Sequence, residues 1–338
     1  MNSAVLVKNK EVGFAQVPIP TPGPNQVLIK VEAAALNPSD VLFMAGHYNI
    51  KLNYPYTPGW EGSGTVVSAG AGIYSEWLVG RRVAFMKAQE LGEYKHGGAY
   101  AEFIVTDTKC CIPLNKDFSF EQAASFVVNP LTAVLMVERC KELKAKTIIL
   151  TAACSQIARM ILRVCKNEGI RVICTVRRPE QVKILKDAGE EFVVDTSVKG
   201  YQKELGGLCL KFKPSVCLEC VSGNTTGEML EYMGFNSTLI LYGTLSEQKA
   251  AGINTVAFIG KKQTIEGFLL NHIIAPYSQF QMLDLIMKVE KMYATELTTV
   301  VQKRFGLHQL QEAMAYYKAN QTAGKILLVP SLTESPKL

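Results

Sequence analysis

The chain has 338 residues, of which 48% are hydrophobic and 20% are charged, the balance of a packed globular protein. Its length suits two domains of ordinary size, and its composition excludes a disordered tail, a collagen-like fibre and a low-complexity scaffold. Lysine and arginine number 36 against 30 aspartates and glutamates, a net charge of +6. Because the basic residues are scattered rather than gathered into a stripe, we expect no nucleic acid as the main partner.

No 18 consecutive residues are apolar, so no membrane span is expected. Residues 4–7 already read as a strand, with no secretory signal ahead of them. The nine cysteines are an odd number and lie mostly in apolar runs, as free thiols do in a reducing compartment. We therefore expect a cytoplasmic protein, with a mitochondrial location as the alternative although no N-terminal presequence is visible.

The first hundred residues read as short strands separated by turns. Residues 27–33 alternate between apolar and polar, residues 62–69 are rich in Gly and Val, and further runs follow at 82–85 and 99–105. The approach to the first long strand is punctuated by four prolines: Pro18, Pro20, Pro22 and Pro24. This β-rich, interrupted stretch predicts a barrel-like domain.

From about Phe120 the pattern changes to strands that alternate with helices. Helical spacing runs over residues 121–141, with a break expected at Asn129-Pro130. Strands are then predicted at 147–151, 171–176, 192–194, 215–220 and 238–242, with helices at 156–167, 179–187 and 228–233. This alternation predicts an α/β domain with a parallel, doubly wound sheet. After about His272 we expect a long amphipathic helix at 279–291 and a last strand at 325–329.

The segment T-A-A-C-S-Q-I-A at 151–158 lies where a dinucleotide-binding loop belongs, after the first strand of the α/β part and at the start of its helix. The glycines of G-x-G-x-x-G are absent, but the residues are small, and Ala158 occupies the last position, which accepts Gly or Ala. Ser155 can cap the helix, and the amides at Ser155, Gln156 and Ile157 are those expected to face a pyrophosphate. The alternative is an ordinary strand-to-helix turn.

The end of the second α/β strand bears on the choice of nucleotide. An NAD site has an acidic residue there to hold the ribose hydroxyls, whereas this chain has Arg177-Arg178-Pro179. Two guanidinium groups suit a 2′-phosphate, and basic residues at a helix start oppose the helix dipole unless an anion binds. The sequence therefore predicts NADPH as the cofactor; the alternative is a solvated helix start that happens to be basic.

A zinc site is not expected. The four histidines, His47, His96, His272 and His308, are each isolated in the sequence. Cys217 and Cys220 lie in an apolar strand pattern that turns neighbouring side chains to opposite faces, and Cys110-Cys111 has no second pair nearby. No C-x₂-C is matched by a second C-x₂-C or by H-x₃-H.

Together the motifs are those of a known family: N-P-S-D at 37–40, G-H-Y at 46–48, P-G-W-E-G-S-G at 58–64, G-G-A-Y-A-E at 97–102, N-P-L-T-A at 129–133 and A-G-K-I at 323–326. Over essentially its whole length the chain resembles the medium-chain dehydrogenase/reductase superfamily, and more closely its zinc-free branch of quinone oxidoreductase-like and 2-enoyl thioester reductase proteins. The resemblance implies a GroES-like β-barrel catalytic domain at residues 1–122, a doubly wound Rossmann domain at 123–271, and a return to the catalytic domain at 272–338. It also implies an active-site cleft between the two domains.

The resemblance also assigns residues. In zinc-dependent relatives the metal ligands fall at positions that match Asn37, Trp60 and, less surely aligned, Val128, which are not a credible ligand set. Tyr48 matches the tyrosine regarded in enoyl thioester reductases as proton donor or orienter of the substrate. The alternatives are that Tyr48 only binds substrate, as in the quinone reductase branch, or only packs in the cleft wall.

Further cofactor contacts are implied by position rather than derived from spacing. Asn37 and Thr132 match groups near the nicotinamide and its ribose or phosphate. Tyr242-Gly243 matches a strand-end turn along the adenosine or pyrophosphate, and Phe268 lies in a segment that flanks the nicotinamide, although an aromatic there usually builds core or a dimer interface. Lys325 matches a basic residue that can approach the phosphate.

The resulting expectation is a zinc-independent, NADPH-dependent oxidoreductase that transfers a hydride to an activated double bond of an enoyl thioester, enone or quinone. The alternative, motivated by the glycine-poor loop, is a non-catalytic reductase-fold subunit or an NADPH-sensing protein of a larger assembly. A phosphorylated carrier could be steered by Lys51, Arg81 and Arg82, and the loop 52–58 would accept an acyl or aromatic group. A homodimer is expected, with residues 238–242 and 253–258 pairing sheets across a two-fold axis.

Overall fold

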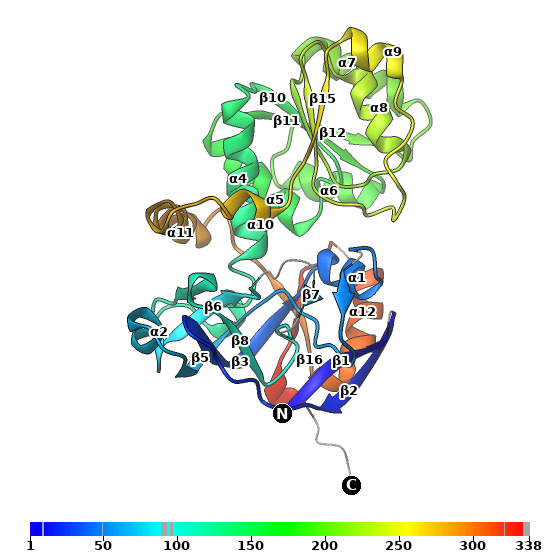
Figure 1. The fold of residues 1–338 in the computed structure, drawn as a ribbon. Helices are drawn as coiled ribbons and strands as arrows, with labels where there is room; N and C mark the ends of the chain where they lie inside the picture. Colours follow the sequence, from blue (N-terminus) through cyan, green and yellow to red (C-terminus); the bar gives the residue numbers. More distant parts are fainter. Residues whose placement is uncertain (9, 49, 89–92, 95–96, 321, 334–338) are drawn as a thin grey trace. The chain divides into compact units, whose positions relative to one another are not determined.

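The computed structural model describes residues 1–333 apart from 9, 49, 89–92, 95–96 and 321. The chain forms two compact units: unit 1 comprises Met1–Pro130 and Thr299–Leu338, and unit 2 comprises Leu131–Thr298. Figure 1 shows that the blue start and the orange-red end of the chain share one unit, while the green and yellow middle forms the other. The first unit is therefore assembled from two distant parts of the sequence.

Unit 1 is built on a seven-stranded sheet with the order β16-β17-β3-β5-β6-β9, in which β8 also pairs with β3. Its elements are β1 (Asn2–Lys8), β2 (Glu11–Gln16), β3 (Gln26–Leu36), α1 (Pro38–Met44), β4 (Lys51–Leu52), β5 (Glu61–Ala69), α2 (Ile73–Leu78), β6 (Arg82–Met86), β7 (Glu93–Tyr94), β8 (Phe103–Asp107), β9 (Cys111–Pro113), α3 (Phe120–Ala123), β16 (Val301–Phe305), α12 (Leu310–Ala319) and β17 (Lys325–Leu328).

The long strand β3 organises this unit. Val27, Ile29 and Val31 are buried while the residues between them are more exposed, the alternation expected of a strand with one face on the core. From Ala33 to Leu36 every residue is buried, because β17 and β5 flank this end of the strand and α3 also packs on β3. The alternating pattern at 27–33 is thus confirmed as a core strand.

Unit 2 contains six parallel strands in the order β12-β11-β10-β13-β14-β15. Its elements are α4 (Val128–Glu142), which begins in unit 1, then β10 (Thr147–Leu150), α5 (Gln156–Asn167), β11 (Arg171–Val176), α6 (Pro179–Asp187), β12 (Phe192–Asp195), α7 (Tyr201–Phe212), β13 (Val216–Glu219), α8 (Asn224–Tyr232), β14 (Thr238–Leu241), α9 (Thr255–Gly260), β15 (Thr264–Gly267), α10 (Leu270–Ile274) and α11 (Gln279–Tyr293). The order 3-2-1-4-5-6 is that of a Rossmann domain, so the predicted doubly wound sheet is confirmed.

The compact units divide the chain later than the expected boundaries after residues 122 and 271. The first division lies at Pro130 because α3 belongs to unit 1, where the Glu121 carboxylate pairs with Arg304 at 2.5 Å. The second lies at Thr298 because α11 belongs to unit 2, where Lys288 Nζ lies 2.5 Å from Glu138 Oε1 on α4.

Local differences from the sequence predictions have simple causes. The helix expected to break at Asn129-Pro130 instead breaks at residues 124–127, and Pro130 lies in the first turn of α4, where a missing N–H removes no helical hydrogen bond. Residues 253–258, expected to pair as a sheet, lie largely in α9, and β14 already has neighbours on both sides. The edge strands of this sheet are β12 and β15.

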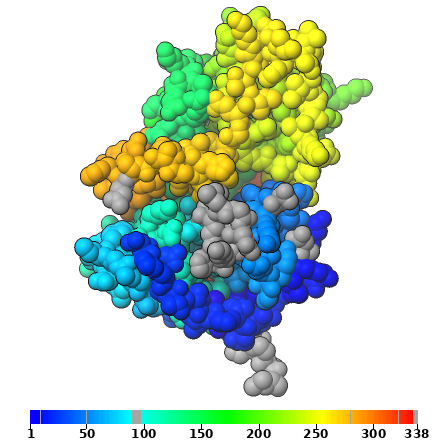
Figure 2. Space-filling view, in the orientation of Figure 1, coloured from blue at the N-terminus to red at the C-terminus, as the bar shows by residue number. Residues whose placement is uncertain are grey.

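The exposed apolar side chains of unit 2 include Val256 (82% exposed) and Ile259 (69%) on α9, which is labelled in Figure 1 and belongs to the yellow part of the surface in Figure 2. The homodimer itself stays a prediction. Among the helices that the structure describes, none is both long enough and apolar enough to span a membrane.

Candidate active site

The residues predicted to bind cofactor in the α/β part gather at one edge of the six-stranded sheet. Since all six strands are parallel, the residues that follow them lie at the same edge, and the strand order reverses between β10 and β13. The segment 151–157 follows β10, the arginine pair follows β11, Tyr242-Gly243 follows β14 and Phe268 follows β15. A crevice at such a reversal point is where open α/β sheets bind nucleotides.

The glycine-poor loop has a well-defined backbone. Ala152 adopts a left-handed conformation with φ +47°, a region that glycine enters at lower cost. Ala153 N donates to Thr175 O at 3.1 Å, which ties the loop to β11. Ser155 is the N-cap of α5, and its hydroxyl accepts the Ala158 N–H at 3.4 Å. The predicted cap is confirmed. The Ser155 N–H itself donates to Ala152 O at 2.9 Å, which takes this amide out of the expected anion site, whereas the Gln156 and Ile157 amides open the helix, where an amide has no intrahelical acceptor.

A residue that sequence reasoning missed also holds this loop. The Arg159 guanidinium folds back from α5, so that Nε donates to Cys154 O at 3.1 Å and Nη2 lies 3.4 Å from Cys154 Sγ. The side chain thereby fixes the Cys154 peptide and adds positive charge beside the loop. An arginine four residues into the helix, after a loop without glycines, was the available sequence signal.

The predicted 2′-phosphate residues are exposed to solvent. Arg177 and Arg178 directly follow β11, and Arg178 is the N-cap of α6. The Arg177 N–H donates to Gln181 Oε1 at 3.3 Å, so the helix start is closed by its own glutamine rather than by an acidic N-cap. Two exposed guanidinium groups at this edge provide the donors that a phosphate binds.

The backbone contacts at Gly243, which follows β14, explain why a small residue stands there. A Cβ at this position would lie 3.0 Å from Cys220 Cβ, so a larger residue after β14 would press on the residue that follows β13. Burial and the nearby Cys220 and Glu219 raise the pKa of the Tyr242 phenol well above its usual value. Phe268 is half-buried, and its N–H donates to Leu241 O at 2.8 Å. At this edge, Tyr242, Gly243 and Phe268 therefore offer backbone groups and aromatic rings and carry no charged side chain.

Unit 1 contains a buried cluster of charged side chains that the sequence did not predict. β3 runs antiparallel between β17 and β5, so Asn37 after β3 meets Glu61 and Lys325, the first residues of β5 and β17. All three are buried. Asn37 Nδ2 donates to Glu61 Oε1 at 3.0 Å, Lys325 Nζ lies 3.4 Å from the same oxygen, and Lys325 also donates to Asn37 Oδ1.

Asp40 on α1 completes this cluster. Its Oδ2 accepts the Asn37 N–H at 2.8 Å and its Oδ1 accepts the Trp60 N–H at 3.0 Å. Burial raises the pKa of Asp40 to about 7, and the Glu61 charge adds to this effect, although the Asn37 N–H and the Lys325 ammonium oppose it. Two carboxyl groups and one ammonium are therefore buried together, and near neutral pH Asp40 carries a proton in part of the molecules.

The positions that match zinc ligands in relatives are bonded to these two carboxyl groups. Asn37 Nδ2 donates to Glu61 and the Trp60 N–H donates to Asp40. Val128 N donates to Glu61 Oε2 at 2.8 Å. Within the described residues no group of three His, Cys, Asp or Glu side chains could hold a metal ion. His96, one of the four histidines considered, lies outside the described residues.

Tyr48 lies in the turn after α1, within an aromatic cluster. Its ring centroid is 6.3 Å from that of Phe43 and 6.1 Å from that of Trp60. The side chain is half-buried and packs on the core of unit 1. This packing fixes the ring, and both proposed roles, proton donation and substrate binding, remain predictions.

Three other predicted residues have surroundings that bear on their roles. Lys325 is only 4% exposed and its ammonium bonds to Asn37 and Glu61, which argues against a role as a phosphate ligand. Arg81 stacks on the Trp77 ring at 3.7 Å and Arg82 on the Phe120 ring at 4.4 Å, so both side chains pack on aromatic rings, and the predicted steering stays a prediction.

Thr132 is buried in α4, one turn after the helix begins. Lys51, the third residue considered for steering, is exposed on β4.

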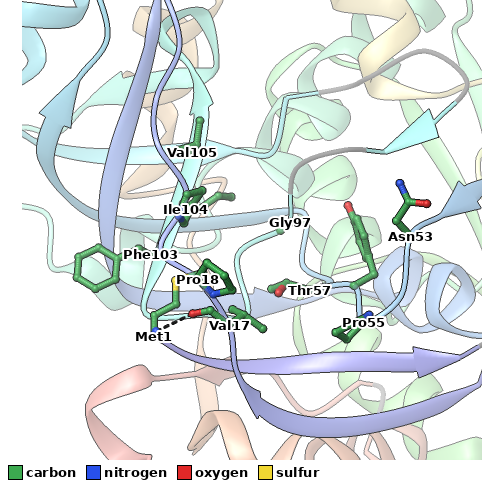
Figure 3. Close-up of a pocket in the computed structure, with 13 residues that line it drawn as sticks. Met1, Val17, Pro18, Asn53, Pro55, Thr57, Gly97, Phe103, Ile104 and Val105 are labelled. Carbon is green, nitrogen blue, oxygen red and sulfur yellow. Dashed lines mark hydrogen bonds between the residues drawn. The ribbon is translucent and has the colours of Figure 1, made fainter.

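A pocket of about 140 Å³ in unit 1 lies beside the loop predicted to accept substrate. Figure 3 shows Asn53, Pro55 and Thr57 of that loop at its wall, opposite Met1 and Pro18. The residues predicted for catalysis and cofactor binding are not among the side chains that line it. The pocket therefore does not mark the expected site of reaction.

Comparison with known proteins assigns both units. A model of the alcohol dehydrogenase GroES-like domain matches residues 23–116, and a model described as zinc-binding dehydrogenase matches residues 157–288. A crystal structure from Mesorhizobium loti, assigned as an NADPH:quinone reductase, has a TM-score of 0.87 and 31% identity and covers 98% of both chains.

Curated relatives include the mitochondrial enoyl-[acyl-carrier-protein] reductase of Arabidopsis thaliana, 27% identical over 73% of this chain and 64% of that protein. Prostaglandin reductase-3 of Mus musculus is 25% identical over 92% of this chain and 83% of that protein. The chain thus spans less than two thirds of the Arabidopsis protein and most of the mouse one. The GroES-like and Rossmann domains expected from the motifs are confirmed: the chain belongs to the medium-chain dehydrogenase/reductase superfamily, in the branch of quinone oxidoreductases and enoyl thioester reductases, and is an oxidoreductase of this kind.

Proposed function

We propose that the chain is an NADPH-dependent, zinc-independent reductase that transfers a hydride to the β-carbon of an activated double bond, in an enoyl thioester, an enone or a quinone. The observation that carries the proposal is the edge of the unit 2 sheet, where the start of α5 and the exposed pair Arg177-Arg178 follow neighbouring strands. Amides at a helix start suit a pyrophosphate and paired guanidinium groups suit a 2′-phosphate. The names of the relatives give an enoyl thioester, a prostaglandin and a quinone as substrates, which supports a reductase of activated double bonds.

The residues at this edge fit a dinucleotide without a bulky obstacle. Ala153, Ser155 and Ala158 keep the turn small, and Gly243 keeps the next strand end open. When bound, the reduced nicotinamide would supply the hydride. The loop amides would hold the pyrophosphate, and the two arginines would distinguish the phosphorylated ribose from the plain one.

Tyr48 is the proposed proton donor. Hydride addition to a β-carbon leaves negative charge on the substrate oxygen, and a hydrogen-bond donor aimed at that oxygen lowers the barrier. A phenol is neutral at working pH, so it can donate this bond and then deliver the proton, directly or through water. The packing against Phe43 and Trp60 would hold the ring in one orientation.

Zinc-independence is supported by the charge balance in unit 1. The Glu61 carboxylate already faces the Lys325 ammonium, and the three positions that match metal ligands are an asparagine, a tryptophan and a valine. A carboxylate with an internal cation and a hydrogen-bonded neighbour needs no metal for neutrality.

The test is cofactor binding by nicotinamide fluorescence. Arg177→Ala/Arg178→Ala should weaken NADPH by about 2–4 kcal/mol, because charge-assisted bonds to the phosphate are lost, and should leave NADH nearly unchanged. Lys183→Ala/Lys186→Ala on the same helix is the matched control, with the same change in charge. Equal losses for the two nucleotides would refute the 2′-phosphate assignment.

A further inference from the structure

The Glu61 carboxylate joins two parts of the chain through its two oxygens. Oε1 accepts Asn37 Nδ2 at 3.0 Å and faces Lys325 Nζ at 3.4 Å. Oε2 accepts the backbone N–H of Val128 at 2.8 Å. Glu61 has no exposed surface, so water cannot replace any of these partners. Both oxygens are therefore fixed by the protein alone.

The Asn37 amide is oriented by opposite charges. Its Oδ1 accepts from the Lys325 ammonium and its Nδ2 donates to the Glu61 carboxylate. A flip of this amide would turn its oxygen toward the anion and its N–H groups toward the cation, so only one orientation is stable. The backbone N–H of Asn37 is held separately by Asp40. The side chain predicted to lie near the nicotinamide is thus held rigidly.

The other oxygen of Glu61 acts on a helix. Val128 is the first residue of α4, and Thr132, the second residue predicted to lie near the nicotinamide, follows one turn later on the same helix. A carboxylate at a helix start satisfies an amide that has no helical partner and interacts favourably with the helix dipole. Glu61 therefore fixes the first residue of this helix.

We infer that Glu61 is a positioning residue for the reaction: its carboxylate sets both the Asn37 amide and the start of the Thr132 helix, with Lys325 as its counter-ion. This inference rests on the proposed function, because the importance of Asn37 and Thr132 depends on a bound nicotinamide. The role needs two acceptor oxygens, and a neutral residue of the same shape provides only one.

Three variants separate positioning from stability. In Glu61→Gln the amide nitrogen must face either Asn37 Nδ2 or the Val128 N–H, so one hydrogen bond is lost, and Lys325 also loses its ion pair with Glu61. Lys325→Met leaves Glu61 without a cation. In Glu61→Gln/Lys325→Met both charges are gone, and replacing a buried ion pair by neutral groups often costs little stability. The double variant should melt close to the wild type, whereas each single variant should melt lower.

Catalysis should not follow the melting temperature. We expect the double variant to bind one NADPH per chain, and this stoichiometry shows what fraction of the molecules is folded. Its turnover should be roughly 10- to 100-fold slower than that of the wild type, because the reacting groups are no longer correctly placed. In hydrogen-exchange mass spectrometry of the free protein, the segment 126–133 should exchange faster than in the wild type. Glu121→Gln, which breaks the surface pair with Arg304, is the matched control and should keep wild-type turnover.

The outcomes are distinct. A double variant that regains both the melting temperature and the turnover of the wild type overturns the positioning role and leaves the proposed function standing. Should the double variant melt low, Glu61→Asp decides: it keeps the charge but is too short to reach both partners, and wild-type turnover would overturn the inference. A wild-type chain that binds no nicotinamide nucleotide refutes the proposed function, and the positioning role with it.

Discussion

The raised pKa of Asp40 makes the stability of unit 1 depend on pH in an unusual direction. The folded state raises the pKa of this carboxyl from 3.8 to about 7, chiefly through burial. Between those two values the folded chain holds a proton that the unfolded chain has lost, so stability falls as the pH rises. A difference of about 3 pH units at about 1.4 kcal/mol each makes the full effect about 4 kcal/mol. The stabilisation is complete below pH 4 and is lost as the pH passes 7.

Comparison with Asp40→Asn isolates this group. Asparagine can accept from only one of the two amides that Asp40 holds, so the variant loses a hydrogen bond at every pH but has no proton to exchange. We expect the wild type to exceed the variant in unfolding free energy by about 4 kcal/mol more at pH 4 than at pH 8.

Urea unfolding followed by tryptophan fluorescence is the suitable assay. Both tryptophans of the chain, Trp60 and Trp77, lie in unit 1, so the signal reports this unit and not the other. Carboxyl groups elsewhere are the same in both proteins and cancel in the difference. A gap between wild type and variant that stays constant from pH 4 to pH 8 would refute the raised pKa and the charge balance argued for the cluster.

Two further predictions concern the proposed site. Tyr48→Phe should lower turnover while the affinity for NADPH stays the same, because the ring keeps its packing and loses only its donor; steady-state kinetics with fluorescence titration checks this, and unchanged turnover would reduce Tyr48 to packing. Ala152→Gly should raise the unfolding free energy by about 0.5–1 kcal/mol, because relief of a left-handed φ outweighs the entropy cost of glycine. Thermal unfolding measures it, and a lower melting temperature would contradict the assigned strain.

Much of unit 2 could be predicted because its signals are local. β10 is a run of four buried residues, and Ser155 caps the helix that follows. Strand ends of a parallel sheet meet at one edge, so the segments after β10 and β11 could be named from the local pattern, whereas Tyr242-Gly243 and Phe268 were named from the family resemblance. The strand β15 escaped prediction because Thr264–Gly267 is short, edge-lying and partly polar. The helix α7 also escaped prediction, because Gly206-Gly207 lowers the helical propensity of this segment.

The charged cluster in unit 1 could not be predicted because its members are brought together by register alone. Lys325 and Glu61 are 264 residues apart and meet only because β17 and β5 flank the same strand. A sequence signal did exist: each is a single charge at the start of an otherwise small or apolar strand, with opposite signs. Pairing the two required the order of strands in the sheet, which no local pattern contains.

The strand β17 has a consequence for the order in which the protein folds during synthesis. Unit 2 is one uninterrupted stretch of chain and can form as soon as residue 298 is available, whereas the sheet of unit 1 still lacks β16 and β17 at that moment. Until Lys325 emerges from the ribosome, Asp40 and Glu61 have no cation to be buried with. Unit 1, which is translated first, is therefore completed last. In a nascent chain stalled before β17, unit 2 can already be folded while the incomplete sheet of unit 1 stays accessible to chaperones.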